Sequence, residues 1–288
     1  MEHKLRNDFF IDSYHYCSLG EGSHGSVILG TNRVTYEHVA IKVVSRFTPS
    51  KQVNRGIFME VNIMKLCHHP NIITFLDFYI DDDANYIVME YAKYGDLLKY
   101  FTEGTNLPSF DIKTVFAQLV SAVEYCHANQ IAHRDLKLEN ILITEIIPFT
   151  VKIADFGLAT NINIDSLHSS FCGTFYYAAH EIICYRPYEP KKVDIWSLGV
   201  ILFSMVTNHH PWPSDDIARH IRNLNYDKTL VKDKVLRDLI SRILVPPEDR
   251  ISLQEIKRHR WMLKCGRTKS FYHLCTDKYK SIKKRFTN

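Results

Sequence analysis

The segment HRDLKLEN, residues 133–140, decides how the rest of this sequence is interpreted. It places three basic and two acidic side chains beside the apolar run 141–143, a mixture that a surface helix can carry without any function. The chemistry becomes specific when DFG, residues 155–157, is added. Asp135 can accept a proton, and Asn140 and Asp155 offer side-chain oxygens of the kind that Mg²⁺ prefers. Lys137 can neutralise negative charge that builds on a group in transfer.

A glycine-rich segment lies upstream, where Gly20, Gly22 and Gly25 have the spacing GxGxxG. Glycines let backbone N–H groups approach phosphate oxygens and permit positive φ in a tight turn. A hairpin without a ligand and a dinucleotide-binding fold share this string, but the dinucleotide fold requires a helix after the turn. Here the β-branched segment 37–45 follows, which predicts a strand and disfavours the dinucleotide fold.

Lys42 lies within that strand, in VAIK at 39–42. An unpaired ammonium group is costly to bury, so Lys42 needs a partner or an exposed position. Glu60 in the following helical segment is the candidate partner. A lysine that extends to solvent and an unrelated surface glutamate remain an equal alternative for this pair alone.

Four motifs, GxGxxGxV, VAIK, HRDLKxEN and DFG, occur in this order, with the segment DIWSLG (194–199) after them. In this the chain resembles eukaryotic protein kinases from about residue 14 to residue 262. The resemblance implies an α+β fold with two lobes: a small antiparallel-sheet lobe at about 14–91 and a larger helical lobe at about 96–263. Residues 1–13 would form an N-terminal extension, and 264–288 a basic tail.

The resemblance also implies roles for individual residues. Asp135 would accept the proton of a substrate hydroxyl, Asn140 and Asp155 would hold Mg²⁺, and Lys137 and Lys42 would complete the catalytic set. Lys42 would contact the α- and β-phosphates of ATP and be oriented by Glu60, and Met89 would gate the back of the adenine pocket. The remaining residues expected to bind ATP are Leu19, Gly20, Glu21, Gly22, Ser23, His24, Gly25, Ser26, Val27, Ala40, Glu90 and Ala92.

Residues 155–174 would form the activation segment. Arg134 is the expected partner of a phosphorylated residue there, and Ser170 is aligned for it. Residues 158–167 contain no Lys or Arg, so Ser169 or no phosphorylation at all stay open as alternatives. Thr174 is the third expected regulatory residue.

Glu181, Asp194 and Arg250 are the expected structural anchors of the large lobe. The usual Ala-Pro-Glu of the family is Ala179-His180-Glu181 here. We expect this departure to affect stability or substrate docking and to leave activity intact, because His180 replaces no catalytic group.

Lys137 and Thr174 resemble their counterparts in serine/threonine kinases, so the expected partners are proteins with Ser or Thr hydroxyls. Asp96 and Glu139 match positions that often recognise a basic residue upstream of the target. The calcium/calmodulin-dependent and AMP-activated kinase group is the most similar, and within it both checkpoint kinases and testis-specific kinases share strings with this chain. A catalytically silent scaffold with a kinase fold is the alternative.

Composition limits the other function classes. The chain has 288 residues, 45% of them hydrophobic, and its longest nearly apolar stretch, 197–206, is too short to span a bilayer. The start lacks the apolar core of a signal peptide.

The seven cysteines are scattered without a CxxC pair, so we expect reduced thiols in the cytoplasm or nucleus. We also expect a monomer. Residues 264–288 carry eight basic and one acidic side chain, so the tail is the only segment expected to reach nucleic acid.

Apolar spacing predicts helices at 56–67, 111–130, 193–208, 235–244 and 252–262, the last capped by Ser252 and Glu255. Strands are predicted around the glycine-rich turn at 16–30, at 37–45 and at 86–92. The pairs His68–His69 and His209–His210 lack the ligand spacing of a metal site.

Overall fold

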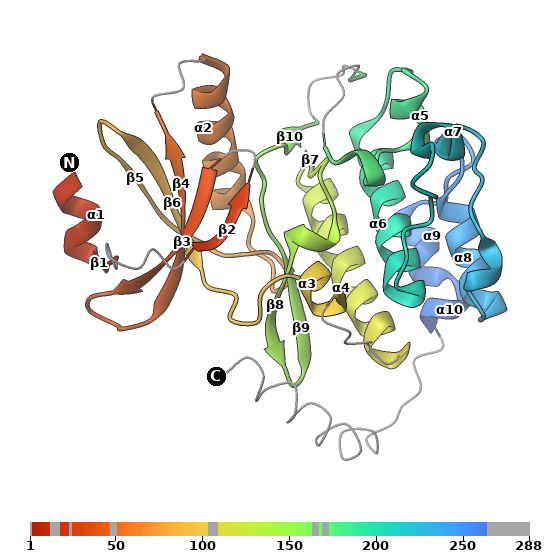
Figure 1. The fold of residues 1–288 in the computed structure, drawn as a ribbon, viewed down its shortest axis with the longest axis horizontal. Helices are drawn as coiled ribbons and strands as arrows, with labels where there is room; N and C mark the ends of the chain where they lie inside the picture. The colour runs from red at the N-terminus through yellow and green to blue at the C-terminus, as the bar shows by residue number, and fades with distance from the viewer. Residues whose placement is uncertain are drawn as a thin grey trace.

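The computed structural model describes residues 2–11, 18–22, 25–46, 51–102, 109–162, 167–168 and 173–263. Ser23, His24 and Ser170, three of the expected site residues, and the basic tail lie outside these ranges. The described chain forms a small lobe built on a sheet and a larger helical lobe, as the sequence predicts (Figure 1).

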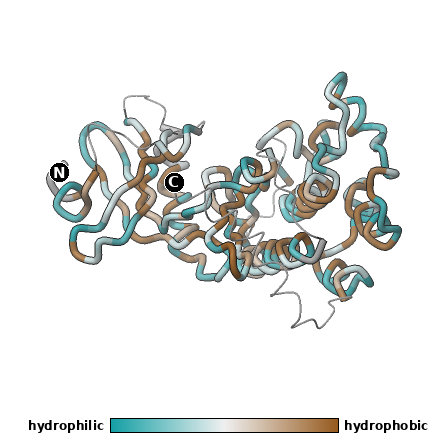
Figure 2. The backbone as a smooth tube through the Cα atoms, turned by 60° about the horizontal axis from the view of Figure 1, so that its bottom comes forward, coloured by the Kyte–Doolittle hydropathy of each residue, from teal (hydrophilic) through white to brown (hydrophobic). Residues whose placement is uncertain are grey.

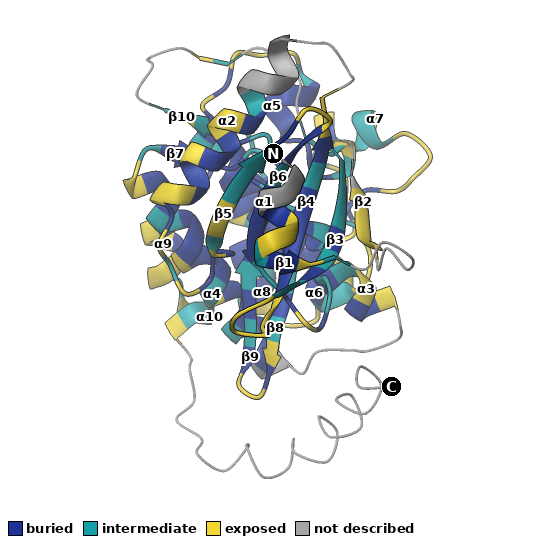
Figure 3. Ribbon diagram, turned by 90° about the vertical axis from the view of Figure 1, so that its left-hand side faces the viewer, coloured by how far each residue is buried: buried dark blue, intermediate teal, exposed yellow. Residues whose placement is uncertain are grey.

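The small lobe is an antiparallel sheet with the order β1-β3-β4-β6-β5, and β2 also pairs with β3. Its strands in the described ranges are β1 (Phe9–Phe10), β2 (Ser18–Gly22), β3 (Gly25–Asn32), β4 (His38–Ser45), β5 (Phe75–Ile80) and β6 (Ala84–Glu90). Helix α2 (Lys51–Leu66) accompanies the sheet. Buried residues follow β4 and β6 (Figure 3), because both are central strands with β-branched and apolar side chains. This confirms the predicted strands and the predicted helix after Lys42.

The N-terminal residues pack onto this sheet. Helix α1 (Glu2–Asp8) leads into β1, which pairs antiparallel with the end of β3. Leu5 and Phe9 are buried in a separate hydrophobic cluster with Ile28, Val39, Ile41 and Val88. Part of the segment predicted as an extension is therefore built into the small lobe.

The large lobe is arranged around two long helices. Helix α6 (Pro190–Thr207) is buried on nearly every face, as its continuous apolar sequence predicts, and it contacts α4 (Ser109–Ala128). Each fully buried large apolar side chain contributes about 1.5–3 kcal/mol, so these helices anchor the lobe. Figure 2 shows hydrophobic segments in the central helices and hydrophilic ones in the outer turns. None of the described helices is long and apolar enough to cross a membrane.

Short elements complete this lobe and carry the segments around the cavity described below. They are α3 (Leu97–Thr102), β7 (Ile131–Ala132), η1 (Leu138–Asn140), β8 (Ile141–Ile146), β9 (Phe149–Ile153), β10 (Thr160–Asn161), η2 (Phe175–Tyr177), α5 (His180–Ile183), α7 (Ile217–Arg222), η3 (Lys228–Leu230), α8 (Lys234–Ile243), α9 (Leu253–Arg258) and α10 (Arg260–Leu263).

One predicted helix is wrong in its extent. The single helix expected at 252–262 is broken at His259, whose φ of −63° and ψ of 139° are extended, so α9 ends before it and α10 follows. The His259 ring explains the break, since Nε2 lies 2.9 Å from Asp238 Oδ2 and Nδ1 accepts from the N–H of Trp261. The spacing of apolar residues along the sequence cannot predict this tertiary contact. The predicted Ser252–Glu255 capping box is confirmed.

Candidate active site

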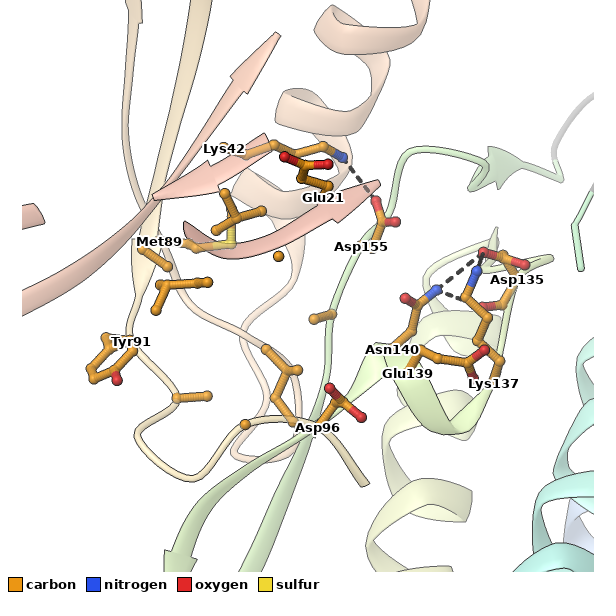
Figure 4. Close-up of a pocket in the computed structure, with 18 of the residues that line it drawn as sticks. Glu21, Lys42, Met89, Tyr91, Asp96, Asp135, Lys137, Glu139, Asn140 and Asp155 are labelled. Atoms are coloured by element: carbon orange, nitrogen blue, oxygen red, sulfur yellow. Dashed lines mark hydrogen bonds and ion pairs between the residues drawn. The ribbon is translucent and has the colours of Figure 1, made fainter. Parts of the chain in front are cut away.

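A cavity of about 940 Å³ is lined by residues of both lobes. Its wall includes most residues expected to bind a nucleotide: Leu19, Gly20, Glu21, Gly25, Val27, Ala40, Lys42, Glu60, Met89, Glu90 and Ala92. Asp135, Lys137, Asn140, Asp155 and Thr174 line the same space. Gly22 and Ser26, which were also expected to bind ATP, lie outside this lining, and Ser26 pairs with Val43 of β4. Figure 4 shows the polar side chains converging on the cavity from β4, η1 and the segment after β9.

Lys42 joins three distant parts of the chain. Its Nζ lies 2.7 Å from Glu60 Oε1 on α2. It also lies 2.8 Å from Asp155 Oδ1 (Figure 4). Lys42 and Glu60 are both buried. Burial by itself lowers the pKa of Lys42, but the two carboxylates outweigh it and the pKa is raised. The ammonium group is therefore kept charged and aimed into the cavity, which excludes the alternative of a lysine that extends to solvent.

The pKa of Asp155 is shifted in the opposite direction to that of Lys42. Burial by itself raises the pKa of this carboxyl, yet Lys42 lowers it on balance, so Asp155 is held as a carboxylate. Its φ of 60° is in the left-handed region, which is strained for a residue other than glycine. Such strain is common where a side chain has to be aimed at a ligand.

Asp135 lies at the centre of a hydrogen-bond network. Asn140 Nδ2 donates to its carbonyl oxygen at 2.9 Å and to Oδ2 at 3.1 Å, and Lys137 Nζ lies 2.9 Å from the same Oδ2. Oδ1 accepts from both the N–H and the hydroxyl of Thr174 at 3.0 Å. Lys137 Nζ also donates to the Thr174 hydroxyl at 2.9 Å. Thr174, expected as a regulatory residue, thus helps to position Asp135.

Asp194 holds the segment that carries Asp135. Its buried carboxylate accepts from the N–H of His133 at 2.9 Å and of Arg134 at 2.8 Å, and Oδ2 lies 2.8 Å from His127 Nε2. Burial raises the pKa of Asp194, but these hydrogen bonds and the nearby histidines lower it overall. The two hydrogen bonds from the backbone N–H groups stabilise the left-handed backbone conformation of Arg134, whose φ is 64°. His127 could not be predicted as a functional residue from the sequence, since a single histidine in an apolar helix carries no distinctive signal.

Gly173 and Arg134 are in close contact. Gly173 has a φ of +93°, and a Cβ there would lie 2.7 Å from the carbonyl oxygen of Arg134, so only glycine fits before Thr174. The Arg134 guanidinium donates to Leu158 O at 2.8 Å and lies 3.4 Å from His168 Nδ1. The structure therefore places Arg134 beside the described part of the predicted activation segment.

A model of the protein kinase domain matches residues 15–262. The chain belongs to the protein kinase domain family. "Probable serine/threonine-protein kinase MARK-C" of Dictyostelium discoideum is 39% identical over 251 residues, which cover 85% of this chain and 32% of that protein. "Serine/threonine protein kinase OSK3" of Oryza sativa subsp. indica is 35% identical, covering 85% and 49%. "Carbon catabolite-derepressing protein kinase" of Secale cereale is 36% identical, covering 84% and 50%.

This kinase domain spans about a third to a half of the length of those relatives. The matched range begins at residue 15, after α1 and β1, so the buried Leu5 and Phe9 add contacts outside the family's common core.

The kinase domain has its predicted anchor between the activation segment and the large lobe. The two terminal guanidinium nitrogens of Arg250, Nη1 and Nη2, each donate to the Glu181 carboxylate at 2.8 Å, and both residues are buried. The adjoining His180 is buried at the first position of α5, and its Nδ1 has no hydrogen-bond partner among the described residues. His180 contacts neither Asp135 nor Lys42 in any described interaction, in keeping with a structural role.

Glu90 makes contacts that the sequence analysis missed. Its Oε1 accepts from the N–H and hydroxyl of Thr74 at 2.7 and 2.9 Å and lies 2.6 Å from Lys152 Nζ on β9. Its N–H donates to Thr74 O, so that donor is already used. The side chain therefore connects the end of β6 to the large lobe, beside the expected adenine pocket.

Proposed function

We propose that this kinase domain transfers the terminal phosphoryl group of ATP to serine and threonine hydroxyls of proteins, with Mg²⁺. One observation carries the proposal: the carboxylates of Asp135 and Asp155, from two separate motifs, face the same cavity as the ammonium group of Lys42. Phosphoryl transfer needs alignment and charge neutralisation more than covalent help from the protein. These groups supply both.

The residues present fit a nucleotide with its metal. A cavity of about 940 Å³ is large enough for ATP, and its glycine-rich rim and Lys42 suit phosphate. Asn140 Nδ2 is hydrogen-bonded to Asp135, so the side-chain oxygen of Asn140 can serve as a metal ligand, and Asp155 lines the same cavity. Mg²⁺ is commonly bound by one or two such oxygens together with phosphate groups, and when bound it neutralises charge on the phosphate oxygens.

Each side chain then has a defined task. Lys42, held by Glu60, binds the α- and β-phosphates, while Asn140 and Asp155 hold the metal. Asp135 accepts the proton of the substrate hydroxyl, and Lys137 stabilises charge on the transferred group. Thr174 keeps Asp135 and Lys137 together, and Val27, Ala40 and Met89 provide apolar contacts for adenine.

Asp96 and Glu139 support a preference for substrates with a basic residue upstream of the target. Both line the cavity, Asp96 from the segment that leads from β6 to α3 and Glu139 from η1 (Figure 4). Each carboxylate can accept charge-assisted hydrogen bonds from a guanidinium or ammonium group of a substrate. The strings 31–44 and 249–261 resemble checkpoint kinases, and they support a signalling role in the cell cycle, in the nucleus or cytoplasm, as part of this proposal.

A direct assay tests the proposal. The purified full chain is incubated with Mg·ATP and a degenerate peptide library, and the phosphorylated sequences are identified by mass spectrometry. We expect phosphate on Ser and Thr, enriched where Arg or Lys precedes them, and none with Asp155→Asn. Failure of the wild-type chain to exceed Asp155→Asn would contradict the proposal. Partner binding that Asp155→Asn leaves unchanged, without any transfer, would favour the scaffold.

A further inference from the structure

The guanidinium group of Arg134 is bound by residues of the activation segment that carry no phosphate. Its Nε donates to the carbonyl oxygen of Leu158 at 2.8 Å, and Nη1 lies 3.4 Å from His168 Nδ1. The backbone that carries the side chain is fixed as well, because the N–H of Arg134 donates to Asp194 at 2.8 Å. Two donors of the guanidinium group are therefore already used where a phosphorylated partner was expected.

His168 is held in place by Tyr188, which lies just before helix α6. The N–H of each residue donates to the carbonyl oxygen of the other, at 3.1 and 2.9 Å, which makes an antiparallel bridge. The two rings also contact each other, with their centroids 5.8 Å apart and their planes inclined by 33°. Tyr188 is buried in the main hydrophobic core. His168 is therefore attached to the interior of the large lobe and can serve as a fixed partner for Arg134.

The His168 ring is the acceptor in its contact with Arg134. A guanidinium group has only donors, so the hydrogen bond requires a lone pair on Nδ1. Burial and the positive charge of Arg134 both lower the pKa of His168, which favours the neutral ring that has such a lone pair. The contact is thus an attraction between a cation and a neutral acceptor, and not a repulsion between two cations.

The activation segment offers no cation of its own to a phosphate. Phosphate groups that order a segment are held by charge-assisted hydrogen bonds, commonly from a cluster of arginines. Residues 155–174 contain no Lys or Arg. A phosphate on Ser169 or Ser170 would therefore have to compete with His168 for Arg134, without a second basic side chain from the segment.

We infer that His168 binds Arg134 in place of a phosphorylated residue, so that the kinase domain is active without phosphorylation of its activation segment. The inference rests on the proposed function and names the regulation of the same site. His168 acts as a positioning residue through Arg134. The carbonyl oxygen of Arg134 is in close contact with Gly173, and the next residue, Thr174, donates twice to Asp135. Arg134 therefore connects His168 to the residues that orient the proton acceptor.

The first experiment asks whether phosphate is needed. The full chain with Ser166→Ala, Ser169→Ala and Ser170→Ala is treated with a phosphatase, and peptide mapping verifies that residues 155–174 carry no phosphate. We expect its initial rate in the peptide assay to be within about threefold of that of the untreated wild type, with no lag. A loss of about tenfold or more, or a lag that ends as phosphate appears in residues 155–174, would overturn the inference.

The second experiment separates the acceptor of His168 from its ring. His168→Phe keeps a ring against Tyr188 but has no acceptor for Arg134, whereas His168→Asn places an acceptor oxygen as many bonds from Cα as Nδ1 is. We expect kcat to fall about tenfold or more with His168→Phe only, because a hydrogen bond to a charged group is then lost. Leu167→Ala, at an exposed neighbouring position, is the control and should match the wild type. The opposite order of the two His168 variants would mean that ring packing is responsible, which would also overturn the inference.

Limited proteolysis with thermolysin tests the same contact without phosphoryl transfer. Cleavage within residues 158–171 should be about tenfold faster in His168→Phe than in the wild type and unchanged in His168→Asn, because the lost contact makes local opening more frequent. If the wild-type chain transfers no phosphate but shows this order, the proposed function fails while the binding of Arg134 by His168 stands. Equal cleavage of the three proteins would refute the role of His168.

Discussion

Glu181 and Arg250 are 69 residues apart and are joined by two hydrogen bonds of 2.8 Å in the interior of the large lobe. Arg250 also donates to the backbone carbonyls of Lys192 and Val245, and its guanidinium lies 5.0 Å from the ring centre of Trp196. The guanidinium group is therefore surrounded by protein groups and is buried from water. The pair fixes α5, and through it the end of the activation segment, to α6.

Removal of Arg250 should be strongly destabilising. Arg250→Ala leaves the Glu181 carboxylate buried and unpaired, which costs about 3–5 kcal/mol in the free energy of unfolding. Chemical denaturation monitored by circular dichroism measures this. Arg242→Ala, which breaks the exposed pair with Asp238, is the control and should cost less than about 1 kcal/mol. Equal effects of the two substitutions would refute the anchor role.

His180→Pro, which introduces the usual residue of the family, should reduce neither stability nor activity. Ala179 has a φ of −71° and a ψ of 154°, the extended conformation that a residue before proline prefers, and His180 is at the first helical position, where proline is well tolerated. The change also removes an imidazole nitrogen that has no partner in the described chain. We expect a free energy of unfolding that is unchanged or higher by about 1 kcal/mol, and full activity in the peptide assay. A drop in kcat would show that His180 has a role in catalysis.

The motifs around Lys42 and Asp135 could be found from the sequence because each is a short string. The chemistry of GxGxxG, VAIK, HRDLKLEN and DFG depends on residues a few positions apart, and their order predicts the two-lobed fold. The Lys42–Glu60 pair could be predicted as one of two alternatives only, since nothing local decides whether the two side chains are buried. The structure decides it, because Glu60 on α2 lies 2.7 Å from Lys42 on β4 and both side chains are buried.

Contacts between distant, chemically ordinary residues could not be predicted in the same way. The pairs His127–Asp194 and Glu90–Lys152 have no local sequence pattern, because only the packing of the fold brings the two residues together. The break at His259 has the same origin, in a side chain of α8. The strand β1, with its buried Phe9, could not be predicted either, since two residues are too few for an alternating pattern.

The stability of the domain at low pH should depend on Asp194. Its pKa in the folded protein is lowered below the ordinary value of 3.8. The stabilisation is therefore present above that value and is lost as the pH falls through the folded pKa. Asp194→Asn cannot accept from His133, Arg134 and His127 together, so it should lower the free energy of unfolding at neutral pH by about 3 kcal/mol or more.

Urea unfolding of both proteins from pH 7 to pH 3.5 measures this, and the difference between them should shrink below about pH 4. Glu248→Gln, at an exposed position, is the control and should follow the wild type at every pH. A difference that stays constant over the whole range would contradict the assignment.

The hydroxyl of Thr174 should matter for catalysis through Asp135 and Lys137. Thr174→Val keeps the shape of the side chain but removes the acceptor for Lys137 and one donor to Asp135. We expect kcat to fall by about 10- to 1,000-fold, because the proton acceptor is no longer held, with little change in KM for ATP. Thr174→Ser retains the hydroxyl and should stay close to the wild type. If both substitutions reduce kcat equally, the hydroxyl alone does not account for the effect, and the packing of the whole Thr174 side chain is responsible instead.

Recognition of an upstream basic residue should depend on the charges of Asp96 and Glu139. Asp96→Asn keeps an acceptor for the N–H of Lys99, which the aspartate now binds at 2.8 Å, so α3 should be undisturbed. Glu139→Gln likewise keeps the size of the side chain near the Tyr177 hydroxyl.

With a peptide that carries Arg upstream of the target, each change should lower kcat/KM by about tenfold or more, because a hydrogen bond to a charged group is lost. With the same peptide carrying Ala in place of Arg, neither change should have an effect, and Glu248→Gln should leave both peptides unaffected. An equal loss for both peptides would mean that the two carboxylates act on the catalytic segment and not on the substrate.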